Sequence, residues 1–157
     1  MDIMLAYDHS RNSRIALDTV KAMFAAIKPN VTLISVIEEP GSSTAVSDEL
    51  FEEQYREQKA GTDAAAAELA AAGFPTKVLV AEGDARKMIL RATQERRPDL
   101  LVMARHSHKP DNGRLNFLTR KLDALVEEFD HMTFGSVSAF LARRVQCPLL
   151  IVPTHAE

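Results

Sequence analysis

The stretch Ile3-Met4-Leu5-Ala6-Tyr7-Asp8-His9-Ser10 sets the fold class, because an apolar run passes directly into a polar turn. The apolar run is too short for a helix, so it predicts a buried strand at 3–7. Ser10 is suited to cap a following helix that extends to about Ile27, and Pro29-Asn30 ends this helix. The apolar face of the helix is expected to contain Ile15, Ala16, Val20, Met23, Phe24 and Ile27.

The same alternation of a short apolar run and a longer helical stretch continues along the chain. Four further strands are predicted at 31–37, 76–81, 100–104 and 149–152. Helices are predicted between them at 47–72, 84–97 and 136–145. Gly61 lies inside the longest of these helices and weakens the prediction that it is unbroken.

Strands that are nearly all apolar and alternate with helices predict an α/β fold. We expect a five-stranded parallel sheet that is covered by helices on both faces and joined by right-handed crossovers. The segment at about 105–133 is far longer than the few residues that usually join a strand to its helix. We interpret it as an insertion within a single domain at 1–157.

The composition and net charge of the chain indicate which classes of binding partner to expect. With 46% hydrophobic and 26% charged residues, the chain of 157 residues is typical of a globular protein. A net charge of −3 argues against bulk attraction to nucleic acid or to an anionic membrane. A single cysteine, Cys147, excludes an internal disulfide and suits a reducing compartment. No signal peptide is recognised, and no apolar run approaches the roughly 18 residues of a membrane-spanning helix. We therefore expect a cytoplasmic protein without a membrane or nucleic-acid partner.

Ligands of open parallel sheets bind beyond the carboxyl ends of the strands, at the point where the strand order switches. The residues at these ends are 8–10, 37–38, 81–84, 104–107 and 134–136. Gly135 at the start of the last helix would let an anion approach the free N–H groups, and Ser136 would add a hydroxyl. The alternative is that Ser136 is only a helix cap and Gly135 only a turn residue.

Several stretches resemble the universal stress protein family, and they occur in the family's order over nearly the whole chain except 105–133. They are Ile3-Met4-Leu5-Ala6-Tyr7-Asp8-His9-Ser10, Gly83-Asp84-Ala85, Pro98-Asp99-Leu100-Leu101-Val102-Met103, Gly135-Ser136-Val137-Ser138 and Cys147-Pro148-Leu149-Leu150-Ile151-Val152. The resemblance implies a flavodoxin-like, Rossmann-like three-layer sandwich with strand order 3-2-1-4-5. It also implies a homodimer formed through the last strand.

The resemblance further implies a stress-response protein that binds ATP or a related adenine nucleotide as a regulatory module. Asp8 would then lie near the adenine and ribose, and Val36 would offer backbone contacts to the base. Gly135, Ser136 and Val137 would hold phosphate, with Mg²⁺ accompanying the nucleotide as the only metal. No motif assembles a nucleophile, a base and an orienting group, so weak ATP hydrolysis is the most turnover that we expect.

The sequence departs from the family pattern in the loop after the fourth strand. The pattern is Gly-x-x-Gly, nine residues and Gly-Ser or Gly-Thr, but Ala104 and Ser107 replace the two leading glycines. In addition, 27 residues (108–134) separate Ser107 from Gly135. Side chains at these two positions weaken a cradle in which backbone amides close on phosphate oxygens. His9 replaces the usual glycine after the acid, and would crowd the base.

The insertion offers two features of its own. Arg105, His106, His108, Lys109 and Arg114 either replace part of the phosphate cradle or form a solvated basic loop. Apolar residues at spacings of 3, 4, 3 and 4 then predict an amphipathic helix within 112–130; they are Leu115, Leu118, Leu122, Leu125 and Phe129.

That helix packs on its own domain, on a second subunit or on a partner protein. The last two cases define an alternative function, a nucleotide-independent member that acts as a dimer or interaction module. His106 and His108, with Asp111 and His131, lack the spacing of a metal site, and we predict solvated histidines.

Overall fold

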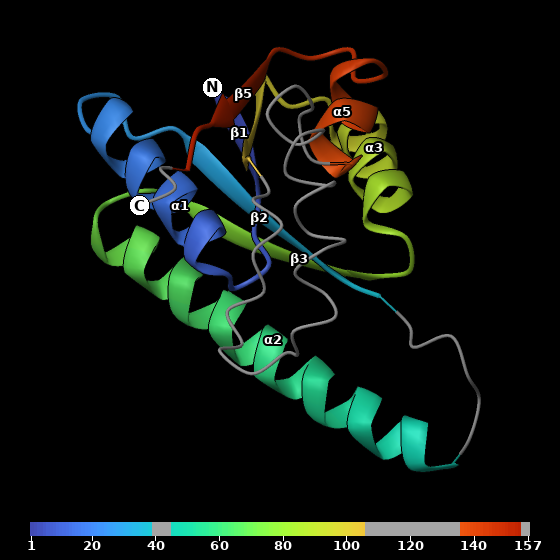
Figure 1. Ribbon diagram of the computed structural model, residues 1–157. Helices are drawn as coiled ribbons and strands as arrows, with labels where there is room; N and C mark the ends of the chain where they lie inside the picture. Colours follow the sequence, from blue (N-terminus) through green and yellow to red (C-terminus); the bar gives the residue numbers. More distant parts are fainter. Residues whose placement is uncertain (39–44, 106–135, 155–157) are drawn as a thin grey trace, which may run out of the picture.

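Five parallel strands form one sheet, and helices cover both of its faces (Figure 1). The computed structural model describes residues 1–38, 45–105 and 136–154. In chain order, its elements are β1 (Asp2–Ala6), α1 (Arg11–Met23), β2 (Asn30–Ile37), α2 (Ala45–Ala71), β3 (Thr76–Glu82), α3 (Ala85–Arg96), β4 (Leu100–Ala104), α5 (Ser136–Ala142) and β5 (Leu149–Val152).

The strand order is β3-β2-β1-β4-β5, which confirms the expected flavodoxin-like arrangement. β1 lies in the centre, where Ile3 is in register with Val31 of β2 and with Leu100 of β4. The chain adds β2 and β3 on one side of β1, and then β4 and β5 on the other side. The switch point therefore lies between β1 and β4, where ligands of such sheets usually bind.

Successive strand residues fill two separate cores, which is why the strands are apolar on both faces. Leu5 and Leu33 pack with residues of α1 and α2 on one face, where Phe74 is fully buried as well. Met4 and Ile34 pack with residues of α3 and α5 on the other face. Full burial of one such large apolar side chain stabilises the fold by about 1.5–3 kcal/mol.

The first helix is shorter than the sequence predicts, and part of its expected apolar face is exposed. α1 ends at Met23, and Phe24 caps it by donating its N–H to Val20 O. Met23 and Ile27 are 60% and 61% exposed, so the expectation that they belong to the buried face was wrong. The reason is local: the chain turns within 24–28 to enter β2, with Lys28 in a left-handed conformation (φ 45°).

The other helices also differ from prediction at their ends or in their continuity. α2 is an unbroken helix of 27 residues in spite of Gly61. α5 ends at Ala142, because the N–H groups of Arg144 and Val145 both donate to Leu141 O in a closing turn. No helix within the described part of the chain is long and apolar enough to cross a membrane.

The start of α3 is fixed by an acidic cap. Asp84 Oδ1 accepts hydrogen bonds from the backbone N–H groups of Arg86 at 2.9 Å and Lys87 at 3.4 Å. The Arg86 guanidinium also binds this carboxylate, with Nη2 2.7 Å from Oδ2. The Arg86 side chain, assisted by the two backbone N–H groups, lowers the pKa of Asp84 to about 2. The cap therefore stays charged under ordinary conditions and orients α3 beside the end of β3.

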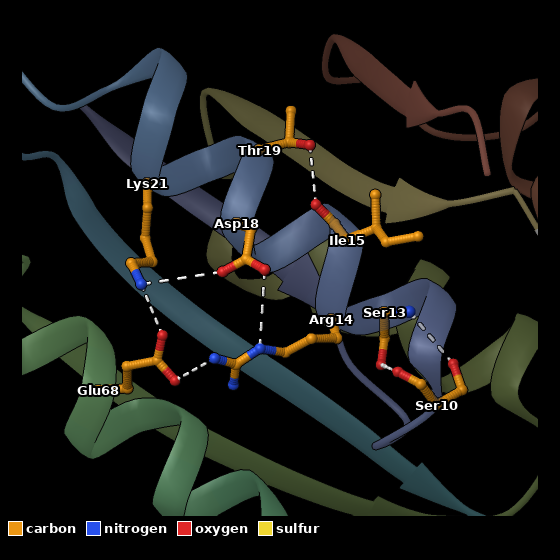
Figure 2. A network of polar contacts seen from close by, with 8 residues as sticks. All are labelled: Ser10, Ser13, Arg14, Ile15, Asp18, Thr19, Lys21 and Glu68. Carbon is orange, nitrogen blue, oxygen red and sulfur yellow. Dashed lines mark hydrogen bonds and ion pairs between the residues drawn. The ribbon is translucent and has the colours of Figure 1, made fainter. Parts of the chain in front are cut away.

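A polar network ties α1 to α2 on one face of the sheet, as Figure 2 shows. Glu68 of α2 accepts from Lys21 Nζ and from Arg14 Nη2, each at 2.6 Å. Asp18 lies 3.8 Å from both cations. The hydrogen bond from Lys21 is the main cause of a lowered pKa at Glu68, and Arg14 adds to it. The network therefore favours the ionised form of Glu68 in the folded state.

We predict that Glu68→Gln destabilises the protein at pH 7 by less than about 1 kcal/mol, because the pairs are partly exposed and screened. A carboxylate whose pKa is lowered by folding stabilises the protein above its unfolded pKa of about 4.3, and this contribution is lost as the pH falls through the folded pKa. Urea unfolding should therefore show a smaller difference in unfolding free energy between the wild type and Glu68→Gln at pH 3 than at pH 7.

Glu95→Gln is the matched control, since Glu95 pairs with Arg91 on the same helix, α3, and the pair is more exposed. It should change the free energy of unfolding by less than Glu68→Gln at pH 7. A loss of stability in Glu68→Gln that is the same at both pH values would contradict a lowered pKa of Glu68 in the folded protein.

Candidate functional site

A cleft of about 410 Å³ opens at the carboxyl ends of β1, β2 and β4, beside the switch point. Its volume lies within the range of small-molecule sites. The polar residues that line it include Asp8, Ser10, Asn12, Glu38, Gln54 and Gln58. The apolar residues include Tyr7, Ile34, Val36, Met103, Ala104 and Val137. A mostly apolar wall with a few polar groups suits a flat organic ligand that carries hydrogen-bonding atoms.

Asp8 follows β1 and is held in place by the start of α1. Its Oδ1 accepts from Ser10 N at 3.0 Å and from Ser10 Oγ at 2.5 Å. Ser10 Oγ in turn caps α1 by accepting from Ser13 N at 3.2 Å. Both bonds from Ser10 use Oδ1 of Asp8, a residue that lines the cleft, so Oδ2 takes part in neither of them.

Val36 presents its backbone to the cleft because β2 is longer than β1. The Tyr7 N–H donates to Ile34 O at 2.9 Å, and Gly83 N–H donates to Ile37 O on the other side of β2. Since strand residues direct their backbone groups to alternate sides, the N–H and C=O of Val36 face the β1 side, just past Tyr7. A donor and an acceptor on one open strand edge can pair with a base that carries both.

Gln58 of α2 contacts this strand edge from the face of the sheet that α2 covers. Its Nε2 donates to Val36 O at 3.2 Å and to Ser35 Oγ at 3.0 Å. Ser35 is fully buried on the face of the sheet that α2 covers. The half-buried Gln58 thus joins α2 to the end of β2 at the cleft.

His9 packs on α2. Its backbone is left-handed (φ 63°), a conformation that glycine adopts without strain. The imidazole lies so close to Gly61 that a Cβ built there would be 2.5–2.8 Å from three ring atoms. Tyr7 contacts the same ring edge-on, with 6.3 Å between centroids. Gly61 is thus the position at which α2 leaves room for this ring, and His9 is not among the residues that line the cleft.

The remaining residues of the predicted site fall into two groups. Ala104 and Val137 line the cleft, whereas Arg105 is exposed beyond β4, with its N–H bonded to Val152 O at 2.8 Å. Ser136 is the first residue of α5. Ser107, Gly135, the other basic residues of the insertion and the helix expected within 112–130 lie outside the described residues.

Sequence reasoning missed Gln54 and Gln58. Their spacing of four residues places both on one face of α2, a signal that was available. The sequence did not indicate that this face would reach the strand ends.

The described part of the cleft is acidic. Asp8 and Glu38 line it, and no lysine or arginine is among the described lining residues. Glu38 Oε1 also accepts from the N–H of Ala85, the first residue of α3, at 3.4 Å. Carboxylates accept hydrogen bonds from hydroxyl groups, so this part suits a sugar better than a phosphate. Within residues 1–38, 45–105 and 136–154, no group of three or more His, Cys, Asp or Glu side chains is placed to hold a metal ion.

The sequence matches the model of the universal stress protein family over residues 1–153. Solved structures are similar as well. UspA from Lactobacillus plantarum is 15% identical with a TM-score of 0.74, over 97% of each chain. A universal stress protein in complex with cAMP is 22% identical with a TM-score of 0.64, over 99% of this chain and 98% of that one.

A universal stress protein family protein from Arabidopsis thaliana with AMP bound is 17% identical with a TM-score of 0.63, over 99% of this chain and 93% of that one. At these identities the structural similarity shows a shared fold. No curated protein sequence matches this chain significantly.

The contact of His9 with Gly61 predicts that the two residues are energetically coupled. In a His9→Gly background, Gly61→Ala should stabilise the protein by about 0.5–1 kcal/mol, because alanine is the better helix former. With His9 present, the same substitution should stabilise less or destabilise, since its Cβ overlaps the ring. Urea unfolding of the four proteins gives the coupling free energy.

Ala60→Gly, one residue earlier at an exposed position of α2, is the control and should destabilise equally in both backgrounds. An equal gain from Gly61→Ala with and without His9 would show that the contact has no energetic weight.

Proposed function

The chain belongs to the universal stress protein family, and on this basis we propose that it binds an adenine nucleotide as a regulatory module. The observation that carries the proposal is the open edge of β2 at Val36, with Asp8 in the same cleft. The neighbours with AMP and with cAMP bound support the choice of an adenine nucleotide.

The base would lie between the apolar residues of the cleft, with its ring edge against the N–H and C=O of Val36. This pairing suits adenine, which offers a ring nitrogen as acceptor beside an amine as donor. Asp8 Oδ2 would accept from a ribose hydroxyl. The phosphates would extend toward Ala104 and the start of α5, where Gly135, Ser136 and Val137 would contact them, as the family resemblance implies. If the nucleotide is ATP, Mg²⁺ would accompany the phosphates that extend toward α5.

The same proposal includes a role in the stress response in the cytoplasm, carried out by one domain at 1–157. It also includes a homodimer formed through β5. This strand lies at the edge of the sheet and pairs with β4 on its other side. An edge strand of this kind offers unpaired backbone groups to a second copy.

We predict that ATP, ADP, AMP or cyclic AMP raises the unfolding temperature, because a ligand specific for the native state stabilises it. At 100 times the Kd the gain is about 2.7 kcal/mol. Asp8→Asn should weaken binding by about tenfold, since Oδ1 can still accept from Ser10 while the acceptor at Oδ2 is lost.

Asp63→Asn, on the exposed side of α2, is the control and should leave the affinity unchanged. Mass analysis of ligand released from the purified protein would identify the nucleotide. No shift with any of the four nucleotides would overturn the proposal and leave a nucleotide-independent interaction module.

We also predict that Ile151→Pro reduces the mass in solution from that of a dimer to that of a monomer. On β5, Pro148 O accepts from Leu101 N–H and Val152 O accepts from Arg105 N–H. The backbone groups of every second residue from 148 to 152 therefore face β4, and Ile151 directs its backbone N–H outward. Proline at 151 removes an outward donor and no hydrogen bond to β4, although it also replaces a side chain that packs against the core. Ile151→Val is the control, and a wild-type monomer or a dimeric Ile151→Pro would contradict pairing through β5.

A further inference from the structure

The two hydrogen bonds of Gln58 determine which way its side-chain amide faces. Nε2 lies 3.2 Å from Val36 O and 3.0 Å from Ser35 Oγ. A carbonyl oxygen only accepts hydrogen bonds, so the amide nitrogen and not the amide oxygen must face Val36. The orientation of Gln58 is therefore fixed by the backbone, and Oε1 is the atom that takes part in neither bond.

This hydrogen-bonded pair of residues holds two acceptors that a ligand in the cleft could use. Val36 O has two lone pairs and can accept a second donor beside Gln58 Nε2. Gln58 Oε1 belongs to the same amide group, within a residue that lines the cleft. A ligand amine with two hydrogens at this corner of the cleft would donate one to Val36 O and the other to Gln58 Oε1.

We infer that Gln58 makes the cleft selective for purines with a 6-amino group over purines with a 6-oxo group. The inference rests on the proposed function, because it concerns the base of the nucleotide that the cleft would bind. A 6-oxo group would bring a third acceptor to this corner and leave it unpaired. A buried polar group left without a partner is penalised far more than a good pair is rewarded.

AMP and inosine monophosphate are the matched probes, because they differ only at the 6-position and the adjacent ring nitrogen. Their affinities should be measured by calorimetry for the wild type and for Gln58→Met, which keeps the length of the side chain and removes both amide atoms. The wild type should prefer AMP by about tenfold or more. Gln58→Met should reduce this ratio by about fivefold, and the backbone of Val36 accounts for the preference that remains.

Two further variants separate selectivity from a structural role. Gln58→Glu keeps an acceptor oxygen and loses the donor to Val36, so it should bind both nucleotides more weakly and still prefer AMP. Glu57→Met puts the same methionine on the exposed face of α2 and should leave both affinities unchanged.

The outcomes are distinct. A fall of both affinities in Gln58→Met with an unchanged ratio would overturn the inference, because Gln58 would then only hold α2 against β2. It would leave the proposed function intact. A wild type that binds neither nucleotide would overturn the proposed function and the inference together.

Discussion

The difference in length between β1 and β2 is the constraint on which the site depends. β1 ends at Ala6, whereas β2 continues to Ile37 because β3 supports it on the other edge as far as Glu82. The backbone of Val36 is therefore held straight without a strand on its β1 side. A strand edge without a neighbouring strand needs another hydrogen-bonding partner, from the protein, a ligand or water. In this chain Gln58 occupies part of that edge, and the cleft gives access to the remainder.

α2 connects this edge with the loop that follows β1. Gln58 bonds to Val36 O, and Gly61, three residues later, accommodates the ring of His9. The loop that carries Asp8 and the strand that carries Val36 thus both contact one short segment of the same helix. The network of Arg14, Lys21 and Glu68 ties α2 to α1 farther along (Figure 2). A shift of α2 would consequently move both walls of the cleft.

Local patterns predicted the fold well, and tertiary contacts account for the failures. The strands at 100–104 and 149–152 have the predicted bounds, because an apolar run between polar residues needs no distant partner to be recognised. Met23 and Ile27 fit the helical period but lie where the chain turns into β2. Gly61 looks like a weakness in a helix until the ring of His9 is placed beside it. Gln58 belongs to the cleft only through the packing of α2 on β2, which no local pattern shows.

The negative charge of the described cleft residues suits the base and the sugar of a nucleotide and disfavours its phosphates. Asp8 and Glu38 are the charged residues among the described lining, and both would repel a phosphate group placed near them. A carboxylate at this position favours a neutral, hydroxyl-bearing part of a ligand. It follows that the described residues would discriminate nucleotides by base and sugar, and that they supply no cation to a phosphate. Ala104 at the end of β4 carries a Cβ, so it would leave less room than a glycine for backbone amides to close on a phosphate.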